Sequence, residues 1–234
     1  MRIFTQLFIV GLGPGDFELV TFEAVKKAEA SDMILVPRSK IGEQGLAEKI
    51  ISHHLPERSK IPILFPMIRD SKQRQKIIVS QLEAIKPELE SAKTIFFPVI
   101  GDSMLYSTGA YLVEALGKII PDISVNFIPG ISAHSLAASL ARRFLAMSDE
   151  ILTIIPGTAA PEKIASALEH SDSAAIYKPK SEKSIREIIT RFNFKFKKII
   201  RVDFAGLPER QRVIEGLAAL DDIDEYMSII LLCR

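Results

Sequence analysis

Short apolar runs alternate with amphipathic segments along almost the whole chain, and this alternation restricts the fold more than any other feature. Residues 7–10 form a continuous apolar run, as expected of a strand that is covered on both faces. The segment that follows, residues 18–29, spaces its apolar residues as an amphipathic helix does. Because this pair of patterns recurs to the end of the chain, the sequence predicts an α/β fold with mainly parallel strands.

The pattern also predicts where the elements lie and where the chain divides. Strands are expected at residues 7–10, 33–36, 61–65, 94–100, 124–128, 150–155, 174–177, 198–203 and 228–233. Helices are expected at residues 18–29, 45–54, 71–90, 106–117, 132–142, 161–169 and 184–192, where Pro87 can break the long third helix. Pro121-Asp122 interrupts the pattern within residues 117–123, so we expect two α/β lobes, residues 1–118 and 124–234. A cleft between such lobes is the natural place for a ligand.

Composition excludes several functional classes. The chain of 234 residues has a formal net charge of +1, which disfavours nonspecific binding of nucleic acid. Its one cysteine, Cys233, excludes an internal disulfide, and no Cys/His cluster has zinc spacing, so no bound metal is expected. There is no apolar run of about 18 residues, as a membrane-spanning helix requires. We therefore expect a cytoplasmic protein.

The first of three glycine loops, Gly11-Leu12-Gly13-Pro14-Gly15-Asp16, follows the first predicted strand. It invites comparison with the dinucleotide-binding fingerprint, but Asp16 stands where that fingerprint needs a third glycine. Pro14 also removes a backbone N–H that a pyrophosphate would use. A glycine-rich turn in which Asp16 caps the next helix is the alternative interpretation.

The second and third loops also follow predicted strands. Gly101-Asp102 ends an apolar run and is followed by Ser103-Met104-Leu105-Tyr106-Ser107-Thr108, which carries more hydroxyls than a helix cap needs. We consider Ser103 a candidate cap for the helix that follows. The third loop, Pro129-Gly130-Ile131-Ser132-Ala133-His134, leads into a helix of small residues that lets a flat ligand approach the backbone closely. Because ligands of open α/β sheets bind at the carboxyl ends of strands, these loops predict the site.

With these three loops in this order, the chain resembles the tetrapyrrole methylase family. Gly11 to Asp16, followed by Glu18-Leu19-Val20-Thr21, resembles the family's opening motif. Gly101-Asp102 resembles its Gly-Asp-Pro loop, with Ser103 in place of proline, and Pro129-Gly130-Ile131-Ser132 resembles its Pro-Gly-x-Ser/Thr segment. The resemblance covers essentially the whole chain and implies two α/β lobes, S-adenosylmethionine as methyl donor, a reduced tetrapyrrole as substrate and a homodimer.

Other segments narrow the resemblance to a subgroup that methylates the bridging carbon C-20 on the route to cobalamin. They are Val36-Pro37-Arg38-Ser39, Phe65-Pro66-Met67, residues 102–108 and Tyr226-Met227-Ser228-Ile229-Ile230-Leu231. No pattern tells whether the substrate holds cobalt, and we do not expect His134 to be a cobalt ligand.

The resemblance also implies site residues. The expected cofactor contacts are Pro14, Ile100, Gly101, Asp102, Met104, Leu105, Thr108, Ser132, Ala133, Tyr177, Lys178, Ala205 and Gly206. Asp102 is the candidate catalytic residue, by stabilising charge near the sulfonium or accepting the proton lost after methylation, and a role limited to orienting the loop stays equally open. Because the substrate carries many carboxylates, cations near loops are candidate contacts, namely Arg38, Lys40, Arg69 and Lys180.

Three alternative functions stay open. The first is a methyltransferase of the same family that acts on another corrin carbon, a diphthamide precursor or ribosomal RNA, although the near-neutral charge disfavours RNA. The second is a nicotinamide-dependent oxidoreductase that uses the first glycine loop. The third is a protein that binds the cofactor without turnover.

Overall fold

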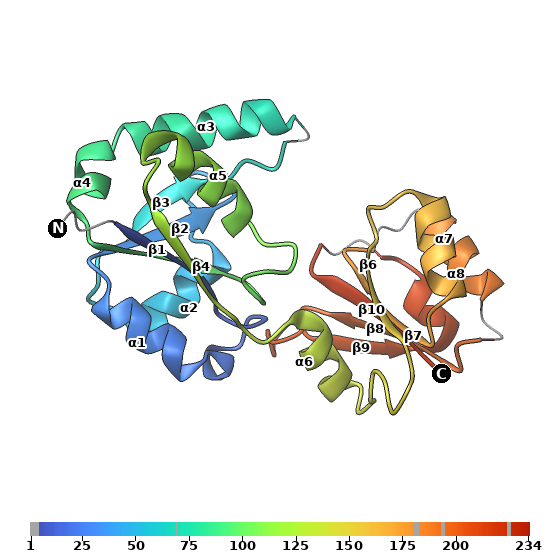
Figure 1. Ribbon diagram of the computed structural model, residues 1–234. Helices are drawn as coiled ribbons and strands as arrows, with labels where there is room; N and C mark the ends of the chain where they lie inside the picture. Colours follow the sequence, from blue (N-terminus) through green and yellow to red (C-terminus); the bar gives the residue numbers. More distant parts are fainter. Residues whose placement is uncertain (1–4, 69, 180–182, 193–194, 224–225) are drawn as a thin grey trace. The chain divides into compact units, whose positions relative to one another are not determined.

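The computed structural model describes residues 5–68, 70–179, 183–192, 195–223 and 226–234, and it divides the chain into two compact units (Figure 1). The first unit is Met1–Ser132 and the second is Ala133–Arg234. Each unit has its own five-stranded sheet. No helix in the described part of the chain is long and apolar enough to cross a membrane.

The first unit is a parallel sheet with helices on both faces. Its strand order is β3-β2-β4-β1-β5, formed by β1 (Gln6–Gly11), β2 (Met33–Arg38), β3 (Ile61–Leu64), β4 (Thr94–Val99) and β5 (Ser124–Ile128). Its strands pair in parallel throughout the described residues. In Figure 1, α1 (Phe22–Ala30) and α2 (Leu46–His54) lie on one face, and α3 (Ser71–Glu83), α4 (Lys86–Ser91) and α5 (Gly109–Ile119) on the other.

Alternation along the strands divides the core of this unit into two layers. Leu7 and Ile9 of β1 pack into one hydrophobic cluster with Leu112 of α5 and Ile78 of α3. Phe8 and Val10, which point to the opposite face, join the cluster that includes Ala24 of α1 and Ile50 of α2. Burial of an aliphatic or aromatic side chain is worth about 1.5–3 kcal/mol, so a strand covered on both faces needs a continuous apolar run.

The second unit has a mixed sheet of order β6-β7-β10-β8-β9, formed by β6 (Leu152–Pro156), β7 (Ser173–Tyr177), β8 (Lys198–Asp203), β9 (Arg212–Glu215) and β10 (Ser228–Cys233). Strand β6 is parallel to β7, but β10 is antiparallel to both β7 and β8, and β9 is antiparallel to β8. The helices α7 (Pro161–Glu169) and α8 (Lys183–Arg191) cover one face and α6 (Ala133–Leu140) the other (Figure 1).

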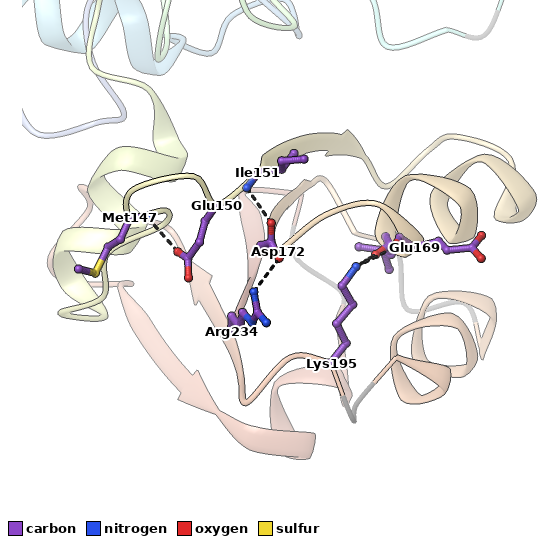
Figure 2. Close-up of polar contacts among 8 residues, drawn as sticks. Met147, Glu150, Ile151, Glu169, Asp172, Lys195 and Arg234 are labelled. Carbon is purple, nitrogen blue, oxygen red and sulfur yellow. Dashed lines mark hydrogen bonds and ion pairs between the residues drawn. The ribbon is translucent and has the colours of Figure 1, made fainter.

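Two half-buried carboxylates hold the start of this sheet in place. The N–H of Ile151 donates to Oδ2 of Asp172 at 2.9 Å, and Nη1 of Arg234 lies 3.1 Å from Oδ1 of the same side chain (Figure 2). Glu150 accepts a hydrogen bond from the N–H of Met147 at 2.9 Å. These contacts hold the segment before β6 against the end of β10.

The predicted strands are all present, but several expectations need correction. The boundary expected between residues 118 and 124 is misplaced, because β5 pairs with β1 and so completes the first sheet. The second sheet is not mainly parallel, and β9 was not predicted. The second strand, expected at residues 33–36, continues through Pro37 to Arg38. The long third helix is two helices, and Pro87 lies in the first turn of α4, where its missing N–H costs no hydrogen bond.

Candidate functional site

The three glycine loops of the first unit lie at one edge of its sheet. They follow β4, β1 and β5, which are neighbours in that order and run parallel. The carboxyl ends of parallel strands meet at the same edge. The loops at residues 12–16, 100–108 and 129–132 therefore form a contiguous surface, as their order in the sequence predicted.

Glycines lock the three loops together through their backbones. The N–H of Gly101 donates to the carbonyl of Gly13 at 2.7 Å, and the N–H of Gly13 donates to the carbonyl of Gly101 at 3.2 Å. A Cβ atom on Gly130 would lie 2.4 Å from the Gly101 carbonyl oxygen and 2.6 Å from the carbonyl carbon of Gly11. A Cβ on Gly11 would lie 2.5 Å from the nitrogen of Gly130. Only glycine allows this approach of three backbones.

Asp102 joins the second loop to the third. Its Oδ1 accepts a hydrogen bond from the N–H of Met104 at 2.8 Å, and its Oδ2 accepts one from the N–H of Gly130 at 3.1 Å. Both carboxylate oxygens are therefore engaged with backbone donors. Of the two roles predicted for Asp102, this geometry supports the orientation of the loops.

Replacing Asp102 with alanine is expected to raise the KM for S-adenosylmethionine about tenfold while leaving kcat within about fivefold. The loops would lose two charge-assisted hydrogen bonds that hold them in place, and the loss of one such bond is worth about 1.5–3 kcal/mol. Steady-state kinetics with the donor concentration varied up to saturation check both constants. A fall in kcat of about 100-fold would instead show that the carboxylate takes part in the chemistry. Asp16→Ala is the control, because among the described residues the Asp16 side chain hydrogen-bonds only the N–H of Glu18, two residues along.

The rest of the second loop presents both polar and apolar side chains. Met104 is 68% exposed and Tyr106 is 44% exposed, and Tyr106 has a positive φ of 51°. Partial burial raises the pKa of the Tyr106 hydroxyl above its ordinary value, so it stays neutral at neutral pH. Leu105 and Thr108 are half-buried.

Ser103 does not have the predicted capping role. The helix α5 begins only at Gly109, whose N–H donates to Oγ of Ser107 at 3.0 Å. Ser103 is buried, and its Oγ has no hydrogen-bond partner among the described residues. The first loop behaves as expected, because Oδ1 of Asp16 accepts the N–H of Glu18 at 2.9 Å and caps the short helix η1 (Phe17–Leu19). Pro14 in the same loop is buried.

In the second unit, the remaining predicted contacts gather at one edge of the mixed sheet. Tyr177-Lys178 ends β7, and Ala205-Gly206 follows β8. Both strands are antiparallel to β10, so their carboxyl ends flank the start of β10. The N–H of Lys178 donates to the carbonyl of Ser228 at 3.2 Å, which places the end of β7 next to the start of β10.

Unusual backbone angles mark this edge. Lys178 and Phe204 both have a φ of 50°, a region that residues other than glycine rarely adopt. Gly206 has a φ of 85°, and its N–H donates to Oε1 of Gln211 at 3.1 Å. Backbone strain of this kind is concentrated at functional sites, so the observed angles favour a binding role for these two turns.

His134 contacts Tyr177, one of the predicted cofactor residues. From the sequence, His134 was considered only as a cobalt ligand, a role that we did not expect. Its Nδ1 lies 2.7 Å from the hydroxyl oxygen of Tyr177, which also accepts the N–H of His134 at 3.2 Å. With one N–H already donated to this oxygen, the hydroxyl proton can be directed to Nδ1. The start of α6, with Ala133, is thereby fixed to the end of β7.

A buried charge cluster below the same edge was missed. Asp203, 1% exposed, accepts a hydrogen bond from Oγ of Ser228 at 2.6 Å. Arg201 is 3% exposed, and its Nε lies 3.2 Å from Oδ1 of Asp203. Arg212 is exposed, and its Nη2 lies 3.1 Å from Oδ2 of Asp203. The signal was present, because Arg201 and Asp203 are two apart at the end of a strand that is otherwise apolar after Lys198, and so they share a face.

The candidate substrate cations have different environments. Arg38, at the end of β2, makes a two-point hydrogen bond to the buried Glu48 of α2, with Nε and Nη2 at 2.7 and 2.6 Å from the two carboxylate oxygens. Lys40 is exposed and lies 3.6 Å from Glu43. Arg69 and Lys180 lie outside the described residues.

The Arg38–Glu48 pair should make stability depend on acidic pH. Hydrogen bonding to Arg38 lowers the pKa of Glu48 below the ordinary value of 4.5. A carboxyl group whose pKa is depressed on folding stabilises the protein above its unfolded pKa and loses that contribution as the pH falls through the folded pKa. We expect the free energy of unfolding of the wild type to exceed that of Glu48→Gln by about 2 kcal/mol at neutral pH. This difference should shrink below about pH 4.5. Urea unfolding at several pH values checks this, and a difference independent of pH would contradict it.

Within the described residues, no three His, Cys, Asp or Glu side chains gather as a metal site.

Comparison with known proteins supplies a family. A family model described as Tetrapyrrole (Corrin/Porphyrin) Methylases matches residues 6–221. The chain is 29% identical to a cobalt-precorrin-2 C(20)-methyltransferase of Salmonella typhimurium, over 74% of this chain and 72% of that protein. It is 28% identical to a probable cobalt-precorrin-2 C(20)-methyltransferase of Methanocaldococcus jannaschii, over 100% and 98%. A precorrin-2 C(20)-methyltransferase of Sinorhizobium sp is 30% identical, over 74% and 73%.

Solved structures show the same fold. A uroporphyrin-III C-methyltransferase from Thermus thermophilus, solved in complex with S-adenosylhomocysteine, superposes with a TM-score of 0.68 at 17% identity, covering 97% of this chain and 92% of that one. A putative cobalamin synthesis related protein from Corynebacterium diphtheriae superposes with a TM-score of 0.76 at 18% identity, covering 98% of each chain.

Proposed function

The chain belongs to the tetrapyrrole methylase family, and we propose that it is an S-adenosylmethionine-dependent methyltransferase that methylates C-20 of precorrin-2 or of its cobalt complex in cobalamin biosynthesis. Relatives named for the metal-free and for the cobalt-containing substrate match it at similar identity, 30% and 28–29%. Sequence identity therefore supports C-20 as the carbon that is methylated. Both substrate forms, with and without cobalt, are left to be tested.

The observation that carries the proposal is the backbone contact among Gly11, Gly101 and Gly130 at the carboxyl edge of the first sheet. A Cβ on Gly101 itself would meet no atom within 4 Å, although it has a φ of 77°. The second loop is thus packed against the other loops on one side and has room for added atoms on the side of the Gly101 α-carbon. This is the combination expected of a loop against which a methyl donor lies.

The reaction depends mainly on the alignment of C-20 with the methyl group and the sulfur of the donor. S-adenosylmethionine supplies a methyl group on a sulfonium leaving group, and the bond that breaks leaves its electron pair on sulfur. The new bond forms at C-20, whose electrons come from the macrocycle, and the C-20 proton is lost afterwards. We assign the loops of the first unit, with Pro14, Ile100, Gly101, Asp102, Met104, Leu105, Thr108 and Ser132, to hold and orient the donor. Orientation alone can supply several kcal/mol of catalysis.

In the second unit we assign Ala133, Tyr177, Lys178, Ala205 and Gly206 to the donor as well. The support is their position at the start of β10 and the positive φ values of Lys178 and Phe204 on either side of it. The ammonium of Lys178 lies 4.8 Å from the ring centre of Tyr226, which restrains the side chain. For Asp102 we propose the orienting role described above.

A direct assay tests the proposal. The protein is incubated with precorrin-2, and separately with its cobalt complex, in the presence of methyl-labelled S-adenosylmethionine. We expect one labelled methyl group per macrocycle, located at C-20 by NMR, and one equivalent of S-adenosylhomocysteine. Label at another carbon would make the chain a family member of different specificity. If NAD but not S-adenosylhomocysteine raises the melting temperature, a nicotinamide-dependent enzyme is favoured instead.

We also propose that the protein is a cytoplasmic homodimer. The segment before β6 supports a contact with a second copy, because Phe144, Met147 and Ile151 are 81%, 61% and 55% exposed. Hydrogen bonds to Glu150 and Asp172 pin this segment, so its apolar side chains are presented on a fixed backbone (Figure 2). Light scattering during size-exclusion chromatography should give twice the chain mass of 26.0 kDa, and Phe144→Asp should shift it toward the monomer. A monomeric wild type would contradict the proposal.

A further inference from the structure

A small cavity lies beside the carboxyl ends of β2 and β3, at the same edge of the first sheet as the glycine loops. Its volume is about 120 Å³, which is room for about four water molecules. Its walls are formed chiefly by Arg38, Lys40, Ile41, Pro62, Leu64 and Gln81. We refer to it as the β2–β3 cavity.

The lining of the β2–β3 cavity has a cationic part and an apolar part. Arg38 and Lys40 supply positive charge, whereas Ile41, Pro62 and Leu64 supply aliphatic surface. No carboxylate is among its lining residues. The side chain of Gln81 already has partners in the protein. Its Oε1 accepts the N–H of Leu64 at 2.8 Å, and its Nε2 donates to the carbonyl of Leu64 at 3.1 Å. The lining therefore fits an anion carried on a short aliphatic arm.

Arg38 is a fixed donor in this cavity. Its Nε and Nη2 are held by Glu48, and within the described part of the chain its Nη1 has no hydrogen-bond partner. Glu48 is 3% exposed, so the guanidinium is anchored from the buried side. A pre-oriented planar donor binds a carboxylate with little loss of side-chain entropy.

Lys40 supplies the charge that Glu48 does not neutralise. Its only ion pair in the described chain is with Glu43 at 3.6 Å, and both side chains are about 70% exposed, at 71% and 68%. Such exposed pairs contribute about 0–1 kcal/mol, so a carboxylate ligand can replace Glu43.

The strand order places the cavity on the β2 side of the glycine loops. Strand β2 pairs with β4 only at Met33 and Ile34, and from Leu35 onward it pairs with β3. Two strand positions separate β2 from β1, which is roughly 10 Å where β2 is paired with β4 and more at its end, where it is not. A macrocycle that carries carboxylates around its rim can span that distance.

We propose that the β2–β3 cavity is a subsite for one acetate or propionate carboxylate of the tetrapyrrole, bound by Nη1 of Arg38 and by Nζ of Lys40, with the arm's methylene groups against Ile41 and Leu64. The proposal rests on the proposed function for the identity of the ligand. It assigns the substrate, and not the methyl donor, to this end of the sheet edge.

Charge reversal at Lys40 tests the subsite. Lys40→Glu is expected to raise the KM for the tetrapyrrole about tenfold, because a charge-assisted hydrogen bond is replaced by repulsion. The affinity for S-adenosylhomocysteine and kcat should stay unchanged. The matched control is Lys86→Glu, since Lys86 also forms an exposed ion pair at 3.6 Å, with Glu90, and does not line the cavity. Lys40 is exposed, so its replacement should not disturb folding.

The outcomes separate this proposal from the proposed function. Equal KM values for Lys40→Glu and Lys86→Glu, or a change in donor affinity alone, would overturn the subsite even if C-20 is methylated. If the wild type does not methylate precorrin-2, quenching of uroporphyrin fluorescence gives an independent readout of binding to an octacarboxylate macrocycle. Weaker uroporphyrin binding in Lys40→Glu than in Lys86→Glu would then support the subsite, and equal binding would overturn it. Arg38→Lys keeps the charge but loses the planar donor, and it should raise the dissociation constant for uroporphyrin about fivefold.

Discussion

Gly130→Ala is expected to destabilise the first unit by about 3 kcal/mol and to weaken binding of S-adenosylhomocysteine about 100-fold. The added Cβ would lie 2.4 Å from the Gly101 carbonyl oxygen and 2.6 Å from the Gly11 carbonyl carbon, and both are backbone atoms that cannot rotate away. The third loop must therefore move off the first two, and a displacement of about 1 Å at a binding loop has an effect of this size. Calorimetric titration and urea unfolding measure the two changes.

Gly117→Ala is the matched control for this substitution. Gly117 is exposed within α5, and a Cβ there would meet no atom within 4 Å. Alanine should instead stabilise the helix by about 0.5–1 kcal/mol without affecting ligand binding. If Gly130→Ala behaved like Gly117→Ala, the close contact of the three loops would not be a feature of the protein in solution.

Asp203→Ala should have the largest effect on stability in the second unit, with a loss of about 4 kcal/mol. The substitution leaves the guanidinium of Arg201 buried without its carboxylate, and it removes the acceptor of the Ser228 hydroxyl. Removal of one partner from a buried ion pair costs more than the pair contributes, because the remaining charge stays buried without an opposite charge. Arg201 would keep only the hydrogen bonds from Nη1 to the carbonyls of Ala219 and Asp221 in the described part of the chain. Urea unfolding followed by circular dichroism measures the loss.

Two further variants keep this prediction testable. Arg212→Ala removes the half-exposed partner of the same carboxylate and should cost only about 0.5 kcal/mol. Asp203→Asn keeps an acceptor for Ser228 but not the charge, so its loss should lie between those of the other two variants. Equal effects of Asp203→Ala and Arg212→Ala would show that burial of the charges has little influence on stability.

The sequence predicted the first unit well because its strands are covered on both faces. The continuous apolar runs at β1 and β4 leave no alternative to burial, and a parallel sheet follows from the helices between them. Pro98 is a useful exception in the run of β4, because proline is unusual inside a sheet. At that point β4 pairs with β1 but no longer with β2, which the sequence did not indicate.

The second unit was predicted less well because strand direction is not a local property. The runs at residues 198–203 and 228–233 look like any buried strands, and nothing in them tells that β10 runs antiparallel to its neighbours. The short β9 has only four residues, and most of its side chains are exposed, so it lacks the apolar run by which strands are recognised.

Among the site residues, the glycines were predictable and the charges were not. Gly11, Gly101 and Gly130 are recognisable by their place after apolar runs, and their role depends on backbone conformation and on the lack of a side chain. Arg38 was predicted only as a loop cation, yet it is held by Glu48, ten residues along the chain. Asp16 caps a local turn, as its position in the sequence allowed, whereas the bridge from Asp102 to the third loop joins residues 28 apart and was not predicted.

The sequence by itself determined the strands and helices, the glycine loops at the strand ends and the family, because these depend on the periodicity and conformational range of neighbouring residues. Only the tertiary structure decided which partner each charged side chain meets: Arg38 the carboxylate of Glu48, Asp203 the hydroxyl of Ser228, and Asp102 the N–H of Gly130, 28 residues away. Such partners are set by sheet order and strand direction, which arise when distant segments pack. A charge in the sequence therefore identifies a candidate, and the packing around it determines whether it is free to bind a ligand.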